Sequence, residues 1–97
     1  MRIPKKFKLC GMTITVVDKP GMLKEEKVIG KAVYLHQEIW LDLGCGAHEE
    51  TLEQSFIHEV VHWILWMMNH PLIGDETFVD SFAHFAYQVL DTQVLDN

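Results

Sequence analysis

Cysteine and positively charged residues are both scarce in this chain of 97 residues. Its two cysteines, Cys10 and Cys45, form no C-x-x-C pair and are too few to frame a disulfide-rich secreted domain. We therefore expect reduced thiols in a cytoplasmic protein. The 8 lysines and arginines stand against 14 acidic residues, which gives a net charge of −6. Because no broad basic face can form, neither nucleic acid nor a membrane surface is an expected partner.

Long hydrophobic runs are also missing. The longest, Val60 to Met68, is interrupted by His62 and is too short to span a bilayer. The basic N-terminal stretch is followed by a short apolar segment that ends at residues 18–21, so no signal peptide is expected. A chain of this length favours a single domain, residues 1–97, with one small core.

The first part of the chain, residues 1–46, has the pattern of β-strands. Three runs, rich in β-branched residues or alternating between polar and apolar, are expected strands: 7–17, 28–36 and 38–43. His36 and Gln37 either form a turn between the last two runs or lie within one long strand. The glycines at 44–46 are expected to end the sheet.

The second part is expected to hold two helices. Residues 47–70 contain the first, from Glu49 to Asn69, with acidic residues near its positive end; a capping box at Thr51–Gln54 would start it slightly later. Its apolar side chains point nearly all round, which indicates a buried helix. Residues 75–95 contain the second helix, with Asp75 as its N-cap. The predicted fold is therefore α+β, with a small antiparallel or mixed sheet followed by two packed helices.

One motif lies inside the first predicted helix. The segment from His58 to His62 reads H-E-x-x-H, which places both imidazoles on one face of the helix, where they can share a metal ion. Glu59 points about 100° away from His58, so it can accept a proton from a water molecule without binding the metal. A buried helix that carries such polar groups needs partners for them, and a metal would supply one.

A catalytic zinc ion usually takes three protein ligands and a water molecule, so one protein ligand remains to be found. Glu76 is the best candidate, because it opens the second helix 14 residues after His62 and a short loop makes the two helices antiparallel neighbours. Asp80 lies one turn further on the same face and can accept the free ring N–H of His58 or His62.

The residues His58-Glu59-x-x-His62 followed by Glu76-x-x-x-Asp80 resemble the gluzincin metallopeptidases, the thermolysin-like group. The small size, with strands before two helices, is similar to minimal gluzincins and to the ImmA/IrrE-type metallopeptidases of bacteria and phages. The resemblance covers mainly residues 28–91. It implies that Zn²⁺ is the cofactor and that Glu76 is the third zinc ligand. It also implies that Asp80 contacts a zinc ligand rather than the zinc ion itself.

The resemblance also implies a mechanism, in which Glu59 is the general base of a zinc-dependent endopeptidase that acts on a protein or peptide, in the narrowest case one dedicated protein. The strand from Ile39 to Leu43 is then expected to be the edge that receives the substrate. The alternative is a latent state, in which that cleft holds a partner or the chain's own tail. Three side chains are candidates for stabilising the oxyanion: Tyr34, His36 and His84.

Two alternatives remain open at this point. The chain can be a zinc-binding regulatory or interaction module without turnover, or a small α+β protein in which the motif is accidental. Metal content separates the accidental motif from the other two hypotheses. Replacing Glu59 with glutamine separates the enzyme from the inactive module.

Overall fold

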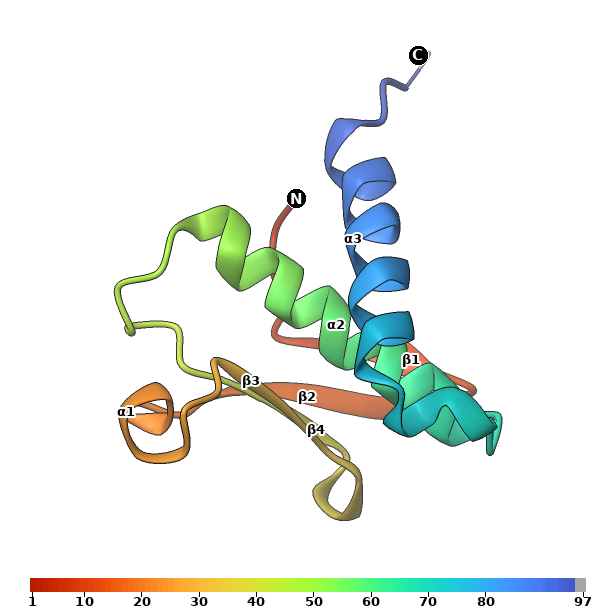
Figure 1. Cartoon of the computed structure of the whole chain (residues 1–97), viewed down its shortest axis with the longest axis horizontal. Helices are drawn as coiled ribbons and strands as arrows, with labels where there is room; N and C mark the ends of the chain where they lie inside the picture. The colour runs from red at the N-terminus through yellow and green to blue at the C-terminus, as the bar shows by residue number, and fades with distance from the viewer. Residues whose placement is uncertain (96–97) are drawn as a thin grey trace.

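A computed structural model describes residues 1–95 of the chain (Figure 1). The elements in chain order are β1 (Lys6–Leu9), β2 (Met12–Asp18), α1 (Met22–Glu26), β3 (Gly30–Val33), the 3₁₀ turn η1 (Tyr34–His36), β4 (Glu38–Leu41), α2 (Glu49–Met67), the 3₁₀ turn η2 (Pro71–Gly74) and α3 (Glu76–Thr92). The predicted α+β class, with the sheet first, is confirmed. The last two residues of the predicted domain lie outside the described residues. None of the helices within residues 1–95 has the length and apolar character needed to cross a membrane.

The four strands form one mixed sheet in the order β1-β2-β4-β3. The outer pairs β1–β2 and β3–β4 are antiparallel, and the central pair β2–β4 is parallel. The predicted strand at residues 7–17 is in fact two strands, because Cys10 and Gly11 form a turn with φ values of 50° and 76°. His36 and Gln37 form the turn that was one of two alternatives, so the next two runs are separate strands.

The sheet order corrects one prediction about the cleft. The strand at Ile39–Leu43 was expected to be the sheet edge, but β4 lies inside the sheet between β2 and β3. The edge beside the helices is β3, since α2 packs against β3 as well as β4. Sequence alternation could not reveal this, because strand order depends on the parallel pairing of β2 with β4, in which Thr15 pairs with Glu38, 23 residues later.

Helix α2 lies between the sheet and α3 and forms the centre of the core (Figure 1). The fully buried side chains come from all three layers: Ile14, Ile39, Leu41, Trp63 and Val79. Trp63 also donates its indole N–H to the carbonyl oxygen of Glu38 at 3.1 Å, which ties α2 to β4. The prediction of a largely buried motif helix is confirmed, because only its C-terminal end, at Trp66, exposes a large apolar side chain.

The helix ends agree with the predictions in one case and differ in another. Asp75 caps α3 as predicted, accepting the backbone N–H of Phe78 at 3.0 Å. The capping box at Thr51–Gln54 is wrong, because α2 already begins at Glu49. The physical reason is the acidic first turn: carboxylates there stabilise the positive end of the helix dipole without a side-chain cap.

Helix α1 was not predicted. It follows Gly21, whose φ of 85° lets the chain turn sharply after β2. The buried carboxylate of Asp42 accepts the backbone N–H of Leu23 at 3.1 Å and thereby joins α1 to the end of β4. This contact brings α1 and the segment after it to the open side of the motif helix.

Candidate metal centre

The two motif histidines lie side by side on α2. Their ring centroids are 4.9 Å apart, as the spacing of one helical turn requires. The side chains of His58 and His62 are only 20% and 13% exposed, so both rings face the cleft between α2 and its neighbours rather than open solvent. The sequence prediction of a shared histidine face is therefore realised in the structure.

Glu76 bridges the two histidines from the start of α3. Its Oε2 lies 3.2 Å from His58 Nε2, and its Oε1 lies 3.1 Å from His62 Nε2. The short connection η2 reverses the chain and sets the first turn of α3 against α2. Nitrogen and oxygen atoms of three side chains thus converge on one small volume, as predicted for Glu76.

Asp80 contacts the back of one histidine ring. Its Oδ1 lies 2.8 Å from His58 Nδ1, while the Nε2 of the same ring faces Glu76. The sequence left open whether Asp80 would contact His58 or His62, and the structure selects His58. A carboxylate in this place orients the ring and makes its other nitrogen a better metal ligand.

Glu59 is buried beside the histidines, with a relative exposure of 8%. Burial is the main cause that raises the pKa of its carboxyl to about 7, and the negative charges of Glu76 and Asp80 add to the effect. A hydrogen bond from the Ala32 backbone on β3 partly offsets the shift. A carboxyl group with its pKa near neutrality is suited to take up and release a proton.

These side chains could hold a metal ion. Two overlapping groups, His58 with Glu59 and His62, and His58 with Glu76 and Asp80, each bring their ligand atoms within 4.8 Å of one another. Among residues 1–95, no lysine or arginine forms an ion pair with these carboxylates; Lys31, which lies nearby, is paired with Glu26 instead. Three carboxylates beside two imidazoles therefore form a concentration of negative charge that a divalent cation would neutralise.

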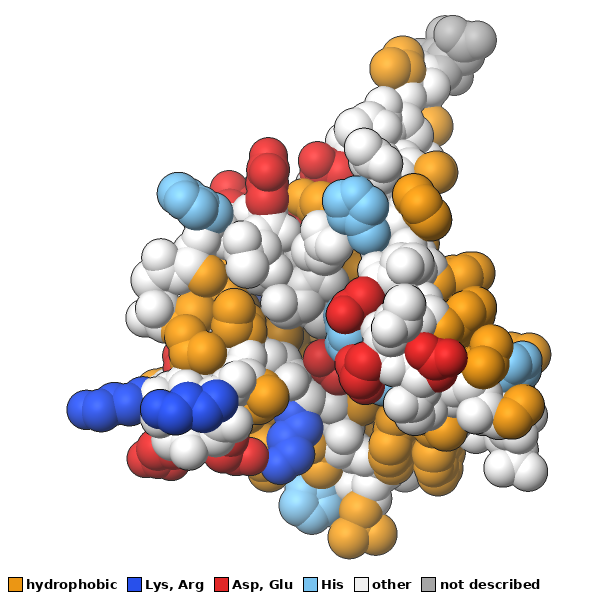
Figure 2. Space-filling view, in the orientation of Figure 1, with side chains coloured by type: hydrophobic (Ala, Val, Ile, Leu, Met, Phe, Trp, Pro, Cys, Tyr) orange, Lys and Arg blue, Asp and Glu red, His pale blue; other side chains and the backbone are white. Residues whose placement is uncertain are grey.

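Two cavities meet at this cluster. One of about 520 Å³ runs under the segment after α1, and one of about 420 Å³ runs along β3 toward η1. Gly30, His58 and Glu59 line both of them. Figure 2 shows acidic side chains gathered around a histidine in the middle of this face. The cluster is thus reachable from two sides.

Comparisons with known proteins identify no relative. No family model, curated protein or solved structure matches this chain. Any assignment of its function therefore depends on the positions of its own residues.

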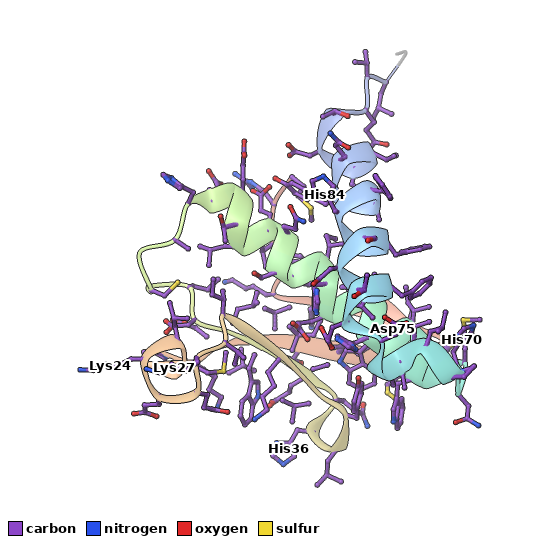
Figure 3. All side chains as sticks on the ribbon, in the orientation of Figure 1. Lys24, Lys27, His36, His70, Asp75 and His84 are labelled. Carbon is purple, nitrogen blue, oxygen red and sulfur yellow. The ribbon has the colours of Figure 1, made fainter. Side chains whose placement is uncertain are left out.

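The three side chains proposed for oxyanion stabilisation are placed very differently. His36 lies at the tip of the turn between β3 and β4, away from the helices (Figure 3). His84 lies further up α3, where its Nδ1 is 3.0 Å from Gln54 Nε2. Of these three side chains, only Tyr34 lines the cavity that His62 and Glu76 also line.

Tyr34 is held in place by two tryptophans. Its ring stacks on Trp66 at a centroid distance of 5.1 Å and an angle of 6°, and meets Trp63 edge-on at the same distance. Partial burial raises the pKa of its hydroxyl, as do the charges of Glu59 and Glu76, so the group keeps its proton. Tyr34 is therefore a fixed hydrogen-bond donor beside the cluster.

Sequence reasoning missed Gly30, which touches the buried glutamate. A Cβ atom at this position would lie 3.1 Å from Glu59 Oε2, 3.2 Å from Glu59 Cγ and 3.0 Å from Leu41 Cδ2. No sequence signal announces this contact, because the glycine is 29 residues from Glu59 and sits in a strand. The absence of a side chain at Gly30 is what lets Glu59 occupy its position.

We expect Gly30→Ala to destabilise the fold by about 1–3 kcal/mol, because the added methyl group overpacks the space between Leu41 and Glu59. Urea unfolding followed by circular dichroism measures this. Gly44→Ala is the matched control, since a Cβ there meets nothing within 4 Å, and its free energy of unfolding should stay within about 0.5 kcal/mol of the parent. Equal stability of the two variants would show that the space between Gly30 and Glu59 can accommodate a methyl group.

Proposed function

We propose that this chain is a zinc-dependent metallopeptidase. The observation that supports it most is the convergence of His58 Nε2 and His62 Nε2 on the carboxylate of Glu76, next to the buried Glu59. Two imidazoles and one carboxylate form a ligand set typical of catalytic zinc, with a fourth position left for water or substrate. Asp80 supports His58 from behind, as in many zinc sites.

When bound, zinc would polarise the substrate carbonyl and lower the pKa of the attacking water. Glu59, buried beside the two histidines, accepts the proton of that water and then delivers it to the departing amine. Tyr34 donates its hydroxyl hydrogen to the oxyanion that develops on the substrate. His58, His62 and Glu76 would hold the metal, and Asp80 fixes the ring of His58.

An extended peptide is the substrate class that suits the cleft. Strand β3 is an edge of the sheet and passes directly beside the metal cluster, so a peptide can pair with it as an added strand. The two cavities on either side of Glu59 would receive side chains from both sides of the bond to be cut. In the narrowest form of this proposal, the enzyme cleaves a single dedicated protein.

Two measurements on untagged protein purified without chelators test the proposal: zinc per chain by elemental mass spectrometry, and cleavage of a fluorogenic peptide library. We expect one zinc ion per chain and zinc-dependent cleavage. One zinc ion with no cleavage of any peptide would leave a zinc-binding module without turnover. A zinc content near zero that does not rise on adding zinc would overturn the assignment altogether.

A further inference from the structure

Helix α3 has two apolar faces: the inner one is buried in the core, and on the outer one only Phe78, at its start, packs partly against the core. The inner face carries Val79, Ala83 and Tyr87, which are buried against the core. The outer face carries a second row of apolar side chains, here called the outer stripe: Phe78, Phe82, Phe85 and Val89. Within it, Phe82, Phe85 and Val89 are 52%, 66% and 65% exposed. A helix on the surface of a globular domain ordinarily shows one apolar face, so the outer stripe needs an explanation.

The outer stripe runs along the free side of α3, where this helix projects from the body of the molecule (Figures 1 and 2). Phe78 follows Glu76 by two residues, and Phe82 follows Asp80 by two residues. At 100° per residue, the outer stripe therefore lies about 200° around the helix axis from the two acidic residues. A partner on the outer stripe would therefore leave the metal cluster and its cavities open.

The spacing of the outer stripe is that of a helix–helix seam. Its positions follow one another at intervals of four, three and four residues, the alternation of the a and d positions in a heptad repeat. The rings of Phe78 and Phe82 already contact each other, with centroids 5.8 Å apart. The partner that fits such a row is another helix with an apolar row of similar length.

The charges around the outer stripe favour a second copy of this chain. Beyond Asp75, which caps the N-terminus of α3, its flanking positions are uncharged: Ser81, Ala86, Gln88, Thr92 and Gln93. The acidic groups of α3 lie on its other sides, where Asp80 contacts His58 and Asp91 contacts the Met1 amine. Two chains with a net charge of −6 each can thus meet along this row without placing carboxylates against each other.

We propose that the outer stripe is the interface of a homodimer in which two α3 helices pack antiparallel about a two-fold axis. Each Phe82 then contacts Phe85 of the partner subunit, and each Phe78 contacts the smaller Val89 of the partner subunit. If Phe82, Phe85 and Val89 expose on the order of 100 Å² each, two copies bury roughly 600 Å², and the exposed part of Phe78 with the flanking residues brings this to about 1,000 Å². That is about the size at which specific interfaces begin.

Sedimentation equilibrium on the full chain tests the proposal, and its readout is independent of any enzymatic activity. We expect the parent to form a dimer of the 11.3 kDa chain. Phe85→Glu should weaken association on the order of 100-fold, because it places a carboxylate in the apolar seam. Leu35→Glu is the matched control, since Leu35 is 90% exposed on η1, away from the outer stripe, and it should remain a dimer.

A mixing experiment tests the antiparallel arrangement. Phe82→Lys and Phe85→Glu chains should each be monomeric alone and should associate when mixed, because position 82 of one copy meets position 85 of the other. Circular dichroism confirms that both are folded; if one is not, the pair Phe78→Lys and Val89→Glu replaces them, because position 78 of one copy meets position 89 of the other. A monomeric parent, a Phe85→Glu chain that dimerises as tightly as the parent, or equal weakening by Leu35→Glu would overturn the proposal. Absence of association in the mixture would overturn the antiparallel pairing.

Discussion

Replacing Glu59 with glutamine lowers the rate of peptide hydrolysis by roughly 10²–10⁴-fold and leaves the zinc content of the protein unchanged. Glutamine has nearly the same shape as glutamate but cannot accept the proton of the attacking water. Its amide still fits the space beside Gly30, where the carboxylate now lies. Initial rates on a cleaved peptide, together with elemental analysis of the same sample, measure both halves of this prediction. A variant that cleaves as fast as the parent would remove Glu59 from the role of general base.

The same variant has a second expected effect, on stability, in the metal-free protein. The pKa of Glu59 is raised from 4.5 to about 7 in the folded chain. The folded state therefore holds this proton more tightly than the unfolded state, and the parent loses stability as pH rises from 4.5 through 7. Metal-free Glu59→Gln should be more stable than the metal-free parent above this range and equal to it below. Urea unfolding at both ends of the range measures the difference, and parallel profiles would contradict the raised pKa.

Replacing Glu76 with alanine weakens zinc binding by more than about 100-fold. If three protein ligands share a binding free energy of about 10 kcal/mol, the loss of one removes about 3 kcal/mol. Glu76 contacts both histidines through its two oxygens, so its removal also leaves His58 and His62 without the group that now holds them together. Competition with a zinc-binding dye gives the dissociation constants.

Glu50→Ala is the control for the Glu76 variant. Glu50 is an exposed carboxylate in the first turn of α2, and it lines a cavity other than the two beside the motif. The substitution removes the same charge from the chain without touching the metal cluster. Zinc affinity should stay at the parent value. If both variants bound zinc equally well, Glu76 would not be a ligand, and the site would have to be completed by another group.

The idea that the chain's own tail covers the cleft finds no support in the described residues. Helix α3 ends at Thr92, and the segment that follows continues away from the sheet (Figure 1). Neither residues 93–95 nor Met1 line the cavities beside Glu59. Within residues 1–95, neither terminal segment occupies the cleft.

Much of the fold was predictable because its signals are local. The two long helices were predicted at Glu49–Asn69 and from Asp75 onward, and they run over Glu49–Met67 and Glu76–Thr92. Helical period, acidic first turns and an aspartate cap each act within one or two turns of chain. Helix α1 was missed because its five residues carry too short a pattern to show any period.

The relative positions of His58, Glu59 and His62 were determined by the sequence itself, because helical geometry fixes side chains one and four residues apart. Glu76 and Asp80 followed from a short connection between two helices. Only the tertiary structure decided that β3 is the sheet edge, that Gly30 makes room for Glu59, and that Tyr34 rather than His36 or His84 lies beside the cluster. It also left Phe82, Phe85 and Val89 of the outer stripe exposed. These features arise from packing between segments far apart in the chain, which no local periodicity encodes.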